Sequence, residues 1–215
     1  MVMENKFLFL GAPGVGKGTL AKQVANTTGL FHLSTGDIFR SVMQEQGALS
    51  QTLAHYMNQG LYVPDELTNQ TFWHFVTTHQ NELHKGFILD GYPRTLNQLE
   101  FLQSKLQLDQ VFHLKLSDPQ VLVARILNRL VCPSCGSVYN KQSKPPLKAN
   151  QCDRCHAMLQ ARNDDTEAVI LKRLTLYEDT VKPLIEAFTK QGILTVIEAQ
   201  LPLEQQVNLV QQLVH

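Results

Sequence analysis

The chain has 215 residues, of which 43% are hydrophobic and 18% are charged. This composition can fill a hydrophobic core and excludes a disordered or coiled-coil protein, while the length suits one α/β domain with insertions better than two separate enzyme domains. Basic and acidic residues number 19 each, so the formal net charge is zero. A neutral chain lacks the overall field of a protein that binds nucleic acid mainly through phosphates. Any bound anion must therefore be held by a local site.

The sequence contains neither a predicted membrane span nor a predicted export signal. No apolar run reaches the roughly 18 residues that a membrane-spanning helix requires. The first apolar stretch, residues 7–10, is short, follows Glu4 and Lys6, and leads directly into a glycine-rich loop. It is therefore not expected to be a signal peptide. These features predict a cytoplasmic protein.

Short apolar runs alternate along the chain with longer amphipathic segments. The predicted strands are residues 7–10, 30–33, 87–90, 111–116 and 193–197. The predicted helices include residues 17–28, 66–84, 118–130, 165–190 and 203–213. Such alternation is typical of an α/β fold in which a parallel sheet carries helices on both faces.

Two segments interrupt this alternation and are predicted to be insertions. Residues 35–65, here called the first insertion, fit short helical pieces. Residues 131–164, here called the cysteine insertion, contain all four cysteines and a polar stretch with prolines, without a continuous helical period. The remaining segments, 1–34, 66–130 and 165–215, are predicted to form the core domain, which carries the sheet and is here called the sheet domain.

A phosphate-binding loop is predicted immediately after the first strand. Gly11-Ala-Pro-Gly-Val-Gly-Lys17 has the G-x-x-x-x-G-K pattern, in which backbone amides, the start of the next helix and the lysine surround phosphate oxygens. Gly18 occupies the position where Ser or Thr usually binds magnesium, and Thr19 follows it. We therefore expect Mg²⁺ to be held mainly by phosphates and water, with Asp90 contacting its water shell. The alternative for Asp90 is a turn cap before a glycine.

The cysteines have the spacing of a zinc site. Two Cys-x-x-Cys pairs are separated by 16 residues, and they comprise Cys132, Cys135, Cys152 and Cys155. In a chain without an export signal this pattern indicates metal binding before disulfides. Four thiolates close a tetrahedral site, so a structural Zn²⁺ is expected and a water-activating zinc is the less favoured alternative. His156 is an alternative ligand, although the four sulfurs already complete the coordination.

Four motifs, the phosphate loop among them, resemble those of the adenylate kinases, and the resemblance spans the whole chain. The motifs are Gly11–Thr19, Ser34-Thr-Gly-Asp-Ile-Phe-Arg40, Asp90-Gly-Tyr-Pro-Arg-Thr95 and Arg162-Asn-Asp-Asp165. The long cysteine insertion is similar to that of the long-lid members. The resemblance implies a P-loop kinase fold with a five-stranded parallel sheet and two mobile insertions. It also implies reversible phosphoryl transfer from MgATP to AMP, giving two ADP and maintaining adenine nucleotide balance.

The same resemblance implies roles for individual residues. ATP would contact Gly14, Val15, Gly16, Lys17, Gly18, Thr19, Arg125, Arg129, Val138 and Tyr139. AMP would contact Thr35, Arg40, Leu61, Tyr62, Val63, Gly91, Tyr92, Pro93, Arg94, Gln98, Arg162 and Arg173. The residues implied in catalysis are Lys17, Arg94, Arg125, Arg129, Arg162 and Arg173. Arginines suit this chemistry because phosphoryl transfer needs positioning and neutralisation of spread charge, and a guanidinium stays protonated and binds phosphate through two hydrogen bonds.

Three positions depart from the family pattern, one of them Tyr92 in place of the more familiar Phe, and alternatives remain open. Leu130 stands where many relatives have a second arginine, and the contact made by the loop at Leu201-Pro202 is undetermined. A kinase for UMP, CMP or GMP, or one that uses GTP as donor, is the nearest alternative. A nucleic-acid-binding zinc ribbon fused to a nucleotide switch is the alternative from another class, given the local positive excess of residues 131–161. The favoured interpretation has ATP, AMP and ADP as ligands, no nucleic-acid or membrane partner, and a monomeric chain.

Overall fold

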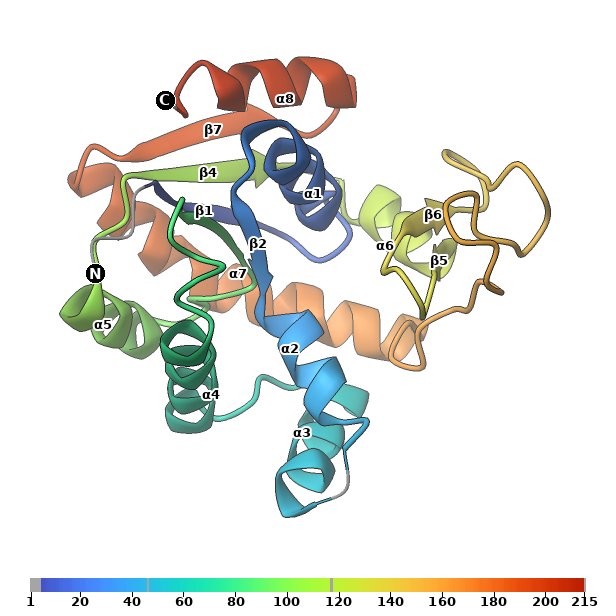
Figure 1. The fold of residues 1–215 in the computed structure, drawn as a ribbon, viewed down its shortest axis with the longest axis horizontal. Helices are drawn as coiled ribbons and strands as arrows, with labels where there is room; N and C mark the ends of the chain where they lie inside the picture. The colour runs from blue at the N-terminus through green and yellow to red at the C-terminus, as the bar shows by residue number, and fades with distance from the viewer. Residues whose placement is uncertain (1–4, 46, 117, 215) are drawn as a thin grey trace.

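The computed structural model describes residues 5–45, 47–116 and 118–214. The predicted domain limits at residues 1 and 215 lie outside this range. A five-stranded parallel sheet forms the centre of the molecule, and its strands occur in the order β2-β3-β1-β4-β7 (Figure 1). The strands are β1 (Lys6–Gly11), β2 (Phe31–Ser34), β3 (Phe87–Asp90), β4 (Gln110–Lys115) and β7 (Leu194–Glu198). Each predicted strand is confirmed with ends within one residue.

The register of the sheet brings loop residues together at one edge. Phe9 and Ser34 both pair with Asp90, and Gly11 pairs with Leu114. Because all five strands are parallel, their carboxyl ends share this edge. In open parallel sheets ligands bind in the crevice outside the carboxyl ends of the strands.

Helices cover both faces of the sheet, as the alternation of elements predicts. On β1, Phe7 and Phe9 belong to one apolar layer, and Leu8 and Leu10 belong to the opposite layer. The first layer is completed by α1 (Lys17–Thr28), α6 (Pro119–Leu127) and α8 (Leu203–Gln211). The second is completed by α4 (Asp65–Thr78) and α5 (Leu96–Lys105), while α7 (Glu167–Lys190) contributes to both. A strand buried on both faces reads as a continuous apolar run, which explains why β1 is recognisable in the sequence.

Three predicted helices end earlier than expected, and the one predicted over 203–213 stops at Gln211. The helix predicted over 66–84 stops at Thr78, where the hydroxyls of Thr77 and Thr78 donate to carbonyls of the preceding turn, a local interaction that competes with helix continuation. The helix predicted over 118–130 stops at Leu127, and Arg129 begins the strand β5 (Arg129–Val131). Antiparallel pairing of β5 with β6 (Val138–Asn140) satisfies the backbone there.

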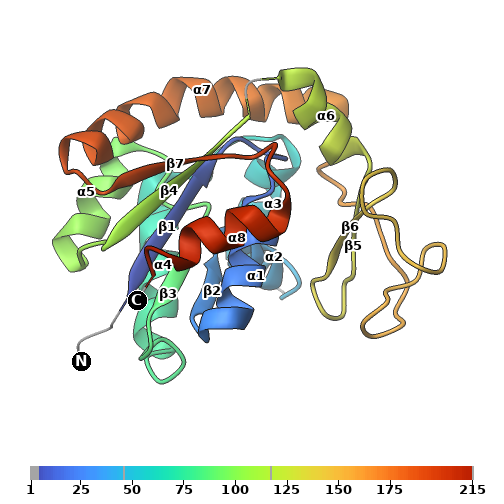
Figure 2. The same ribbon diagram turned by 90° about the horizontal axis from the view of Figure 1, so that it is seen from above.

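The two insertions have separate small cores. In the first insertion, α2 (Thr35–Val42) and α3 (Ala48–Asn58) enclose Phe39, Leu53 and Val63. The cysteine insertion contains β6, turns and no helix, and together with β5 it extends from one end of the sheet domain (Figure 2). None of the described helices combines the length and the apolarity that a membrane crossing needs.

Candidate active site

A cavity of about 530 Å³ lies at the carboxyl edge of the sheet and is lined by both insertions. Such a volume suits a nucleotide-sized ligand. Its walls contain nine basic side chains: Lys17, Lys22, Arg40, Arg94, Arg125, Arg129, Lys144, Arg162 and Arg173. Only three acidic residues line it: Asp37, Asp90 and Asp164. The neutral chain thus concentrates positive charge at one site. A chain of zero net charge needs such a local site to bind an anion.

The phosphate loop joins β1 to α1 with a backbone that requires glycine. Gly14 and Gly16 have φ values of 81° and 112°, which favour glycine. A Cβ on Gly14 would lie 2.7 Å from Cγ1 of Ile126, so the loop packs directly against α6. Gly16 precedes α1 without a side-chain cap, and because the amide of Thr19 already donates to the Gly16 carbonyl at 3.0 Å, the first turn offers the amides of Lys17 and Gly18 to an anion.

Lys17 and Asp90 form the charged centre beside this loop. The ammonium of Lys17 donates to the carbonyls of Gly11 and Ala12 at 2.7 and 3.0 Å. Burial lowers the pKa of Lys17 to about 8, against the opposing effect of Asp90. Burial would raise the pKa of Asp90, but a hydrogen bond with His32 and the charge of Lys17 hold it at about 2, so the carboxylate is ionised at neutral pH.

The two arginines near the cysteine insertion lie on different elements, contrary to the predicted single helix. Arg125 is on α6 and donates to the carbonyl of Val15 at 3.2 Å. Arg129, on β5, donates from Nε and Nη2 to the two carboxylate oxygens of Asp165 at 2.9 and 2.5 Å. Both arginines line the cavity. The bidentate pair fixes the plane of the Arg129 guanidinium.

Three further arginines enter the cavity from other segments. Arg173 on α7 donates to Asp164 at 2.6 Å and to the carbonyl of Met57 in the first insertion at 3.1 Å. Arg40 on α2 pairs with Asp37. Arg162 is different, because its Nε is the one buried side-chain polar atom without a hydrogen-bond partner among the described residues. Burial and the nearby Arg129 and Arg40 lower its pKa to about 10, so the side chain is still charged at neutral pH.

The segment after β3 forms the wall opposite the phosphate loop. Nε of Arg94 donates to the carbonyl of Gly91 at 2.7 Å, and its guanidinium lies 5.1 Å from the centre of the Tyr62 ring. Gly91, Pro93 and Arg94 line the cavity. Tyr92 does not, because its ring is fully buried and stacks on Phe72 with the centroids 4.3 Å apart. Its side chain supports the wall from within the core.

Thr35 also lies behind the cavity surface. It is buried, and its hydroxyl donates to the carbonyl of Gly91 at 3.0 Å. The neighbouring stretch Leu61, Tyr62 and Val63 does line the cavity. Thr35 therefore connects the first insertion to the segment after β3, whereas residues 61–63 reach the open space.

Gln98 has an almost fully buried side chain that nevertheless contributes to the cavity wall. Its Oε1 accepts from the backbone N–H of Arg94 at 2.8 Å, and its Nε2 donates to Asp65 at 2.7 Å. One lone pair and one N–H of the amide are left for a ligand. Both the oxygen and the nitrogen of the side-chain amide are thus held by protein partners.

The far wall is built by β6 and by the loop before α8. Val138 and Tyr139 both line the cavity, but the Tyr139 hydroxyl points into the cysteine insertion, 3.5 Å from Sγ of Cys152. The loop at Leu201-Pro202, whose contact the sequence left open, places Leu201 on the cavity wall. The carbonyl of Leu201 accepts from Nε2 of Gln206 at 2.7 Å. Pro202 is the residue before α8.

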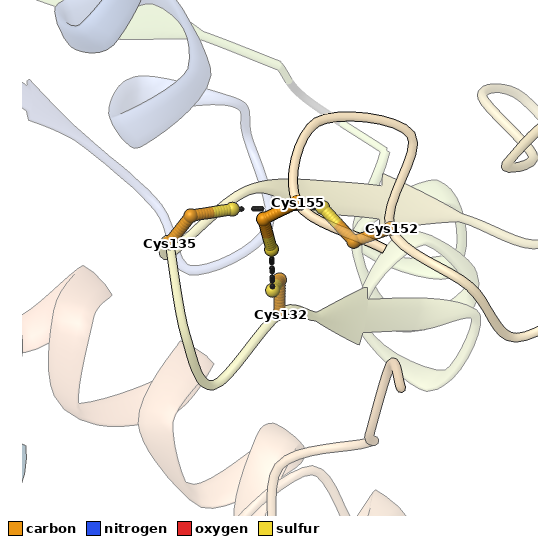
Figure 3. A group of neighbouring side chains, drawn as sticks. All are labelled: Cys132, Cys135, Cys152 and Cys155. Carbon is orange, nitrogen blue, oxygen red and sulfur yellow. Dashed lines mark hydrogen bonds between the residues drawn. The ribbon is translucent and has the colours of Figure 1, made fainter. Parts of the chain in front are cut away.

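The four cysteines converge within the cysteine insertion (Figure 3). Their sulfur atoms all lie within 4.8 Å of one another, and none forms a disulfide. The Cys132–Cys155 and Cys135–Cys152 sulfur pairs are 3.3 and 3.5 Å apart, too far for an S–S bond of about 2.05 Å. Sulfurs bound at about 2.3 Å around one tetrahedral ion need separations of this order. The donor set therefore fits zinc.

Comparison with known proteins agrees with this geometry. A sequence model of the adenylate kinase family matches residues 9–193. Adenylate kinase of Mycoplasma genitalium is 45% identical over 210 residues, which cover 98% of this chain and 97% of that protein. Adenylate kinases of Mycoplasmoides gallisepticum and of a Thermoanaerobacter species are 39% and 40% identical, covering 98% and 93% of the chain and 99% and 93% of those proteins.

The chain belongs to the adenylate kinase family. Its reaction is the reversible transfer of a phosphoryl group between ATP and AMP, and enzymes of this family use Mg²⁺ with ATP. Six of its seven arginines line the cavity, and Arg154 alone does not. An adenylate kinase needs this arrangement because the two reacting nucleotides bring many phosphate charges to one place.

Sequence reasoning missed the acidic partners that orient the basic residues of this adenylate kinase. Asp164 and Asp165 lie within the motif that was used to single out Arg162, yet they hold Arg173 and Arg129. Their signal was present in the motif itself, as two carboxylates beside an arginine. Asp65 gave no comparable signal, because its contact with Gln98 joins residues 33 positions apart.

Proposed function

We propose that ATP binds between the phosphate loop and the cysteine insertion, and that AMP binds between the first insertion and the segment 91–98. The arginine set supports this division, above all Arg162 with its buried and unpartnered Nε. A buried donor without a partner is costly, so the site gains free energy when an anion supplies the acceptor. The transferring phosphoryl group would occupy the space between the two nucleotides and accept hydrogen bonds from Arg162.

The residues of the ATP side act by positioning and by neutralising charge. Backbone amides of residues 14–19 surround the phosphates, and Lys17 exchanges its two carbonyl acceptors for phosphate oxygens. Arg125 and Arg129 approach from the other side of the same phosphates. Asp90 contacts water molecules of the Mg²⁺ shell, which is consistent with its low pKa. Magnesium neutralises the phosphate charge when MgATP is bound.

The acceptor side binds the AMP phosphate and reads its base. Arg40, Arg94 and Arg173 hold the phosphate, with backbone groups of Gly91 to Pro93 beside it. Thr35 and Tyr92 keep this wall in place from behind, because their side chains contact Gly91 and the core. Gln98, helped by backbone groups of residues 61–63, reads the adenine edge, and Val138 and Tyr139 cover the base of ATP.

The two insertions close over the nucleotides and reopen for product release. Water must be excluded during phosphoryl transfer, while exchange of nucleotides requires access to solvent. The separate small cores of the insertions support rigid-body motion against the sheet domain, with the limits 35–65 and 131–164. Distances between spin labels on each insertion and on the sheet should shorten when both nucleotides are bound, and unchanged distances would contradict closure.

The cysteines hold a structural Zn²⁺. Cys132, Cys135, Cys152 and Cys155 supply four sulfur ligands and leave no open coordination position for substrate. A segment of this length cannot build a sufficient core alone, so the metal fastens it. We further propose that the protein works as a monomer in the cytoplasm, where free thiols are maintained.

A substitution of Arg162 tests the assignment of the transferring site. Arg162→Lys keeps the charge but removes the planar fork, and should lower kcat by about 10³-fold, the lower range for an arginine that stabilises phosphoryl transfer. Arg154→Lys is the matched control, since Arg154 belongs to the same insertion but does not line the cavity. A coupled assay with ATP and AMP measures both. Equal effects of the two substitutions would contradict the proposed role of Arg162.

A further inference from the structure

Asp65 makes a hydrogen-bond frame around the side chain of Gln98. Oδ1 of Asp65 accepts from Nε2 of Gln98 at 2.7 Å, and Oδ2 accepts from the hydroxyl of Thr95 at 2.9 Å. Thr95 caps α5 by accepting from the backbone N–H of Gln98 at 3.2 Å. Asp65 itself is the first residue of α4 and does not line the cavity. Its carboxylate therefore acts on the cavity only through Gln98.

The two partners of the Gln98 amide permit only one orientation of it. A carboxylate can only accept hydrogen bonds, so the side facing Asp65 must be the NH₂ group. A backbone N–H can only donate, so the side facing Arg94 must be the oxygen. Rotating the amide by 180° would place oxygen against carboxylate and NH₂ against N–H. Both hydrogen bonds would then be lost at a side chain that is almost fully buried.

The fixed orientation has a direct consequence for base selection. Oε1 and Nε2 each retain one hydrogen-bonding position, an acceptor beside a donor. Adenine offers the complementary pair, an exocyclic amine that donates and a ring nitrogen that accepts. Guanine offers the reverse on that edge, a carbonyl beside a ring N–H. A glutamine free to rotate could serve either base, whereas a locked one serves adenine alone.

We propose that Asp65 is a specificity-determining positioning residue, which locks the Gln98 amide and thereby makes the acceptor site reject guanine. The inference rests on the proposed role of Gln98 as the residue that reads the acceptor base. It assigns the selectivity to a side chain that never touches the nucleotide. The two contacts that fix the amide come from Asp65 and Arg94, and neither belongs to residues 61–63.

The test is a double-mutant cycle on nucleotide selectivity. Asp65→Asn keeps the size of the side chain but lets NH₂ face Gln98, so the flipped amide finds a partner. The ratio of kcat/KM for AMP to that for GMP should fall about tenfold, the worth of one buried hydrogen bond. KM for AMP should rise while KM for ATP stays constant. Glu66→Gln is the matched control, because Glu66 is the next carboxylate of α4 and accepts a hydrogen bond from Gln70 instead of Gln98.

The cycle separates the proposal from the role of Gln98. Gln98→Ala should abolish most of the selectivity, and adding Asp65→Asn to it should change the ratio no further. If Gln98→Ala leaves the ratio intact, both the base-reading role and the inference are wrong. If Gln98→Ala lowers the ratio but Asp65→Asn does not, only the inference is wrong. The inference is also wrong if Asp65→Asn lowers the rates for all nucleotides equally. It is wrong, too, if Asp65→Asn changes the ratio in the Gln98→Ala background.

A measurement on the unmodified enzyme covers the case in which Asp65→Asn does not fold. In the nucleotide-free protein the side-chain NH₂ of Gln98, assigned by its loss in Gln98→Ala, should give a well-resolved NMR signal with slow hydrogen exchange. Its protons should show no nuclear Overhauser effect to the backbone N–H of Arg94 at short range. A rapidly exchanging NH₂, or a strong effect to that N–H, would show a mobile or flipped amide and overturn the proposal.

Discussion

The sheet domain and the cysteine insertion keep their shapes by different means. In the sheet domain, buried side chains fill two apolar layers, and Leu8, Ile88 and Leu89 are wholly inaccessible to solvent. The small core around the cysteines consists of five buried residues, namely Leu130 of β5 together with Cys132, Tyr139, Cys152 and Leu159 of the cysteine insertion. Two of these five are thiols of the four-sulfur cluster. Burial of apolar surface suffices for the first region, but the second requires covalent or metal support.

The difference matters because the cavity is lined by both regions. The sheet domain supplies the phosphate loop, Asp90 and the wall formed by the segment after β3, all of which adjoin strands of the central sheet. The cysteine insertion supplies Val138 and Lys144 and is joined to Arg129 through β5. An insertion with its own small core can move as one body without sharing the core of the sheet domain. Its shape and its position can therefore be changed independently of each other.

Lys17→Met should give the largest effect and should separate function from fold in the sheet domain. Loss of the ammonium removes a charge aimed at the phosphates, so kcat/KM should fall by at least about 10²-fold. Circular dichroism should show intact secondary structure. In the unmodified enzyme, ATP affinity should decrease as pH rises through about 8, because Lys17 then loses its proton before binding. Titration calorimetry from pH 7 to 9 checks this, and a pH dependence that persists in Lys17→Met would contradict the assignment.

Truncation of one buried residue in each region tests the contrast directly. Ile88→Ala in β3 should lower the free energy of unfolding by about 2–5 kcal/mol, since a cavity opens in the core of the sheet domain. Leu159→Ala in the cysteine insertion should leave the main unfolding midpoint almost unchanged while speeding hydrogen exchange over residues 131–161. Denaturant titration and exchange mass spectrometry measure the pair. A global loss from Leu159→Ala as large as that from Ile88→Ala would show that the regions share one core.

Metal removal should affect only the cysteine insertion. The protein purified under reducing conditions should contain about one equivalent of zinc, and its removal by a chelator should loosen residues 131–161 before the sheet domain. Cys152→Ser should mimic the stripped protein, and Ser134→Ala is a matched control inside the same segment, because the Ser134 side chain is exposed. Absence of zinc together with unchanged exchange in residues 131–161 would contradict the structural-metal proposal.

Most of the fold could be predicted from the sequence because its signals are local. A strand buried on both faces appears as an apolar run, and the loop after β1 has a fixed spacing of glycines and lysine. The ends of α4 and α6 could not be predicted. They depend on threonine hydroxyls that compete for helix carbonyls, and on pairing of β5 with a strand that follows a turn. Periodicity alone continues through both positions.

The site was predictable in its residue types and less so in its connections. The glycines, the arginines and the cysteines each belong to a motif that requires them. The contacts that orient them join distant segments, as Asp65 does with Gln98 and as Arg173 does with Met57. Thr35 and Tyr92 belong to complete motifs, yet the fold places their side chains behind the cavity surface. A motif specifies which residues gather at a site but not which of them face the ligand.

Lys22 provides the smallest and most specific test, because it links the two regions. Its ammonium, on α1, donates to the carbonyl of Gly136 beside Cys135 at 2.6 Å. A hydrogen bond with a charged donor is worth about 1.5–3 kcal/mol when it is protected from water, and less here because the side chain is only half-buried. Lys22→Met keeps most of the apolar stem and removes the link, so the cysteine insertion should open more often.

In Lys22→Met we expect the cysteine insertion to change its position relative to the sheet domain while its internal structure stays ordered. Label distances between the cysteine insertion and the sheet should lengthen in the nucleotide-free enzyme, and KM for ATP should rise about fivefold, since closure starts from a more open state. Zinc content and exchange within residues 131–161 should not change, because the thiols hold the segment together. Lys172→Met, on the exposed side of α7, is the matched control. If Lys22→Met instead loosened the insertion internally, its shape would depend on the sheet domain, and the two regions would not be independent.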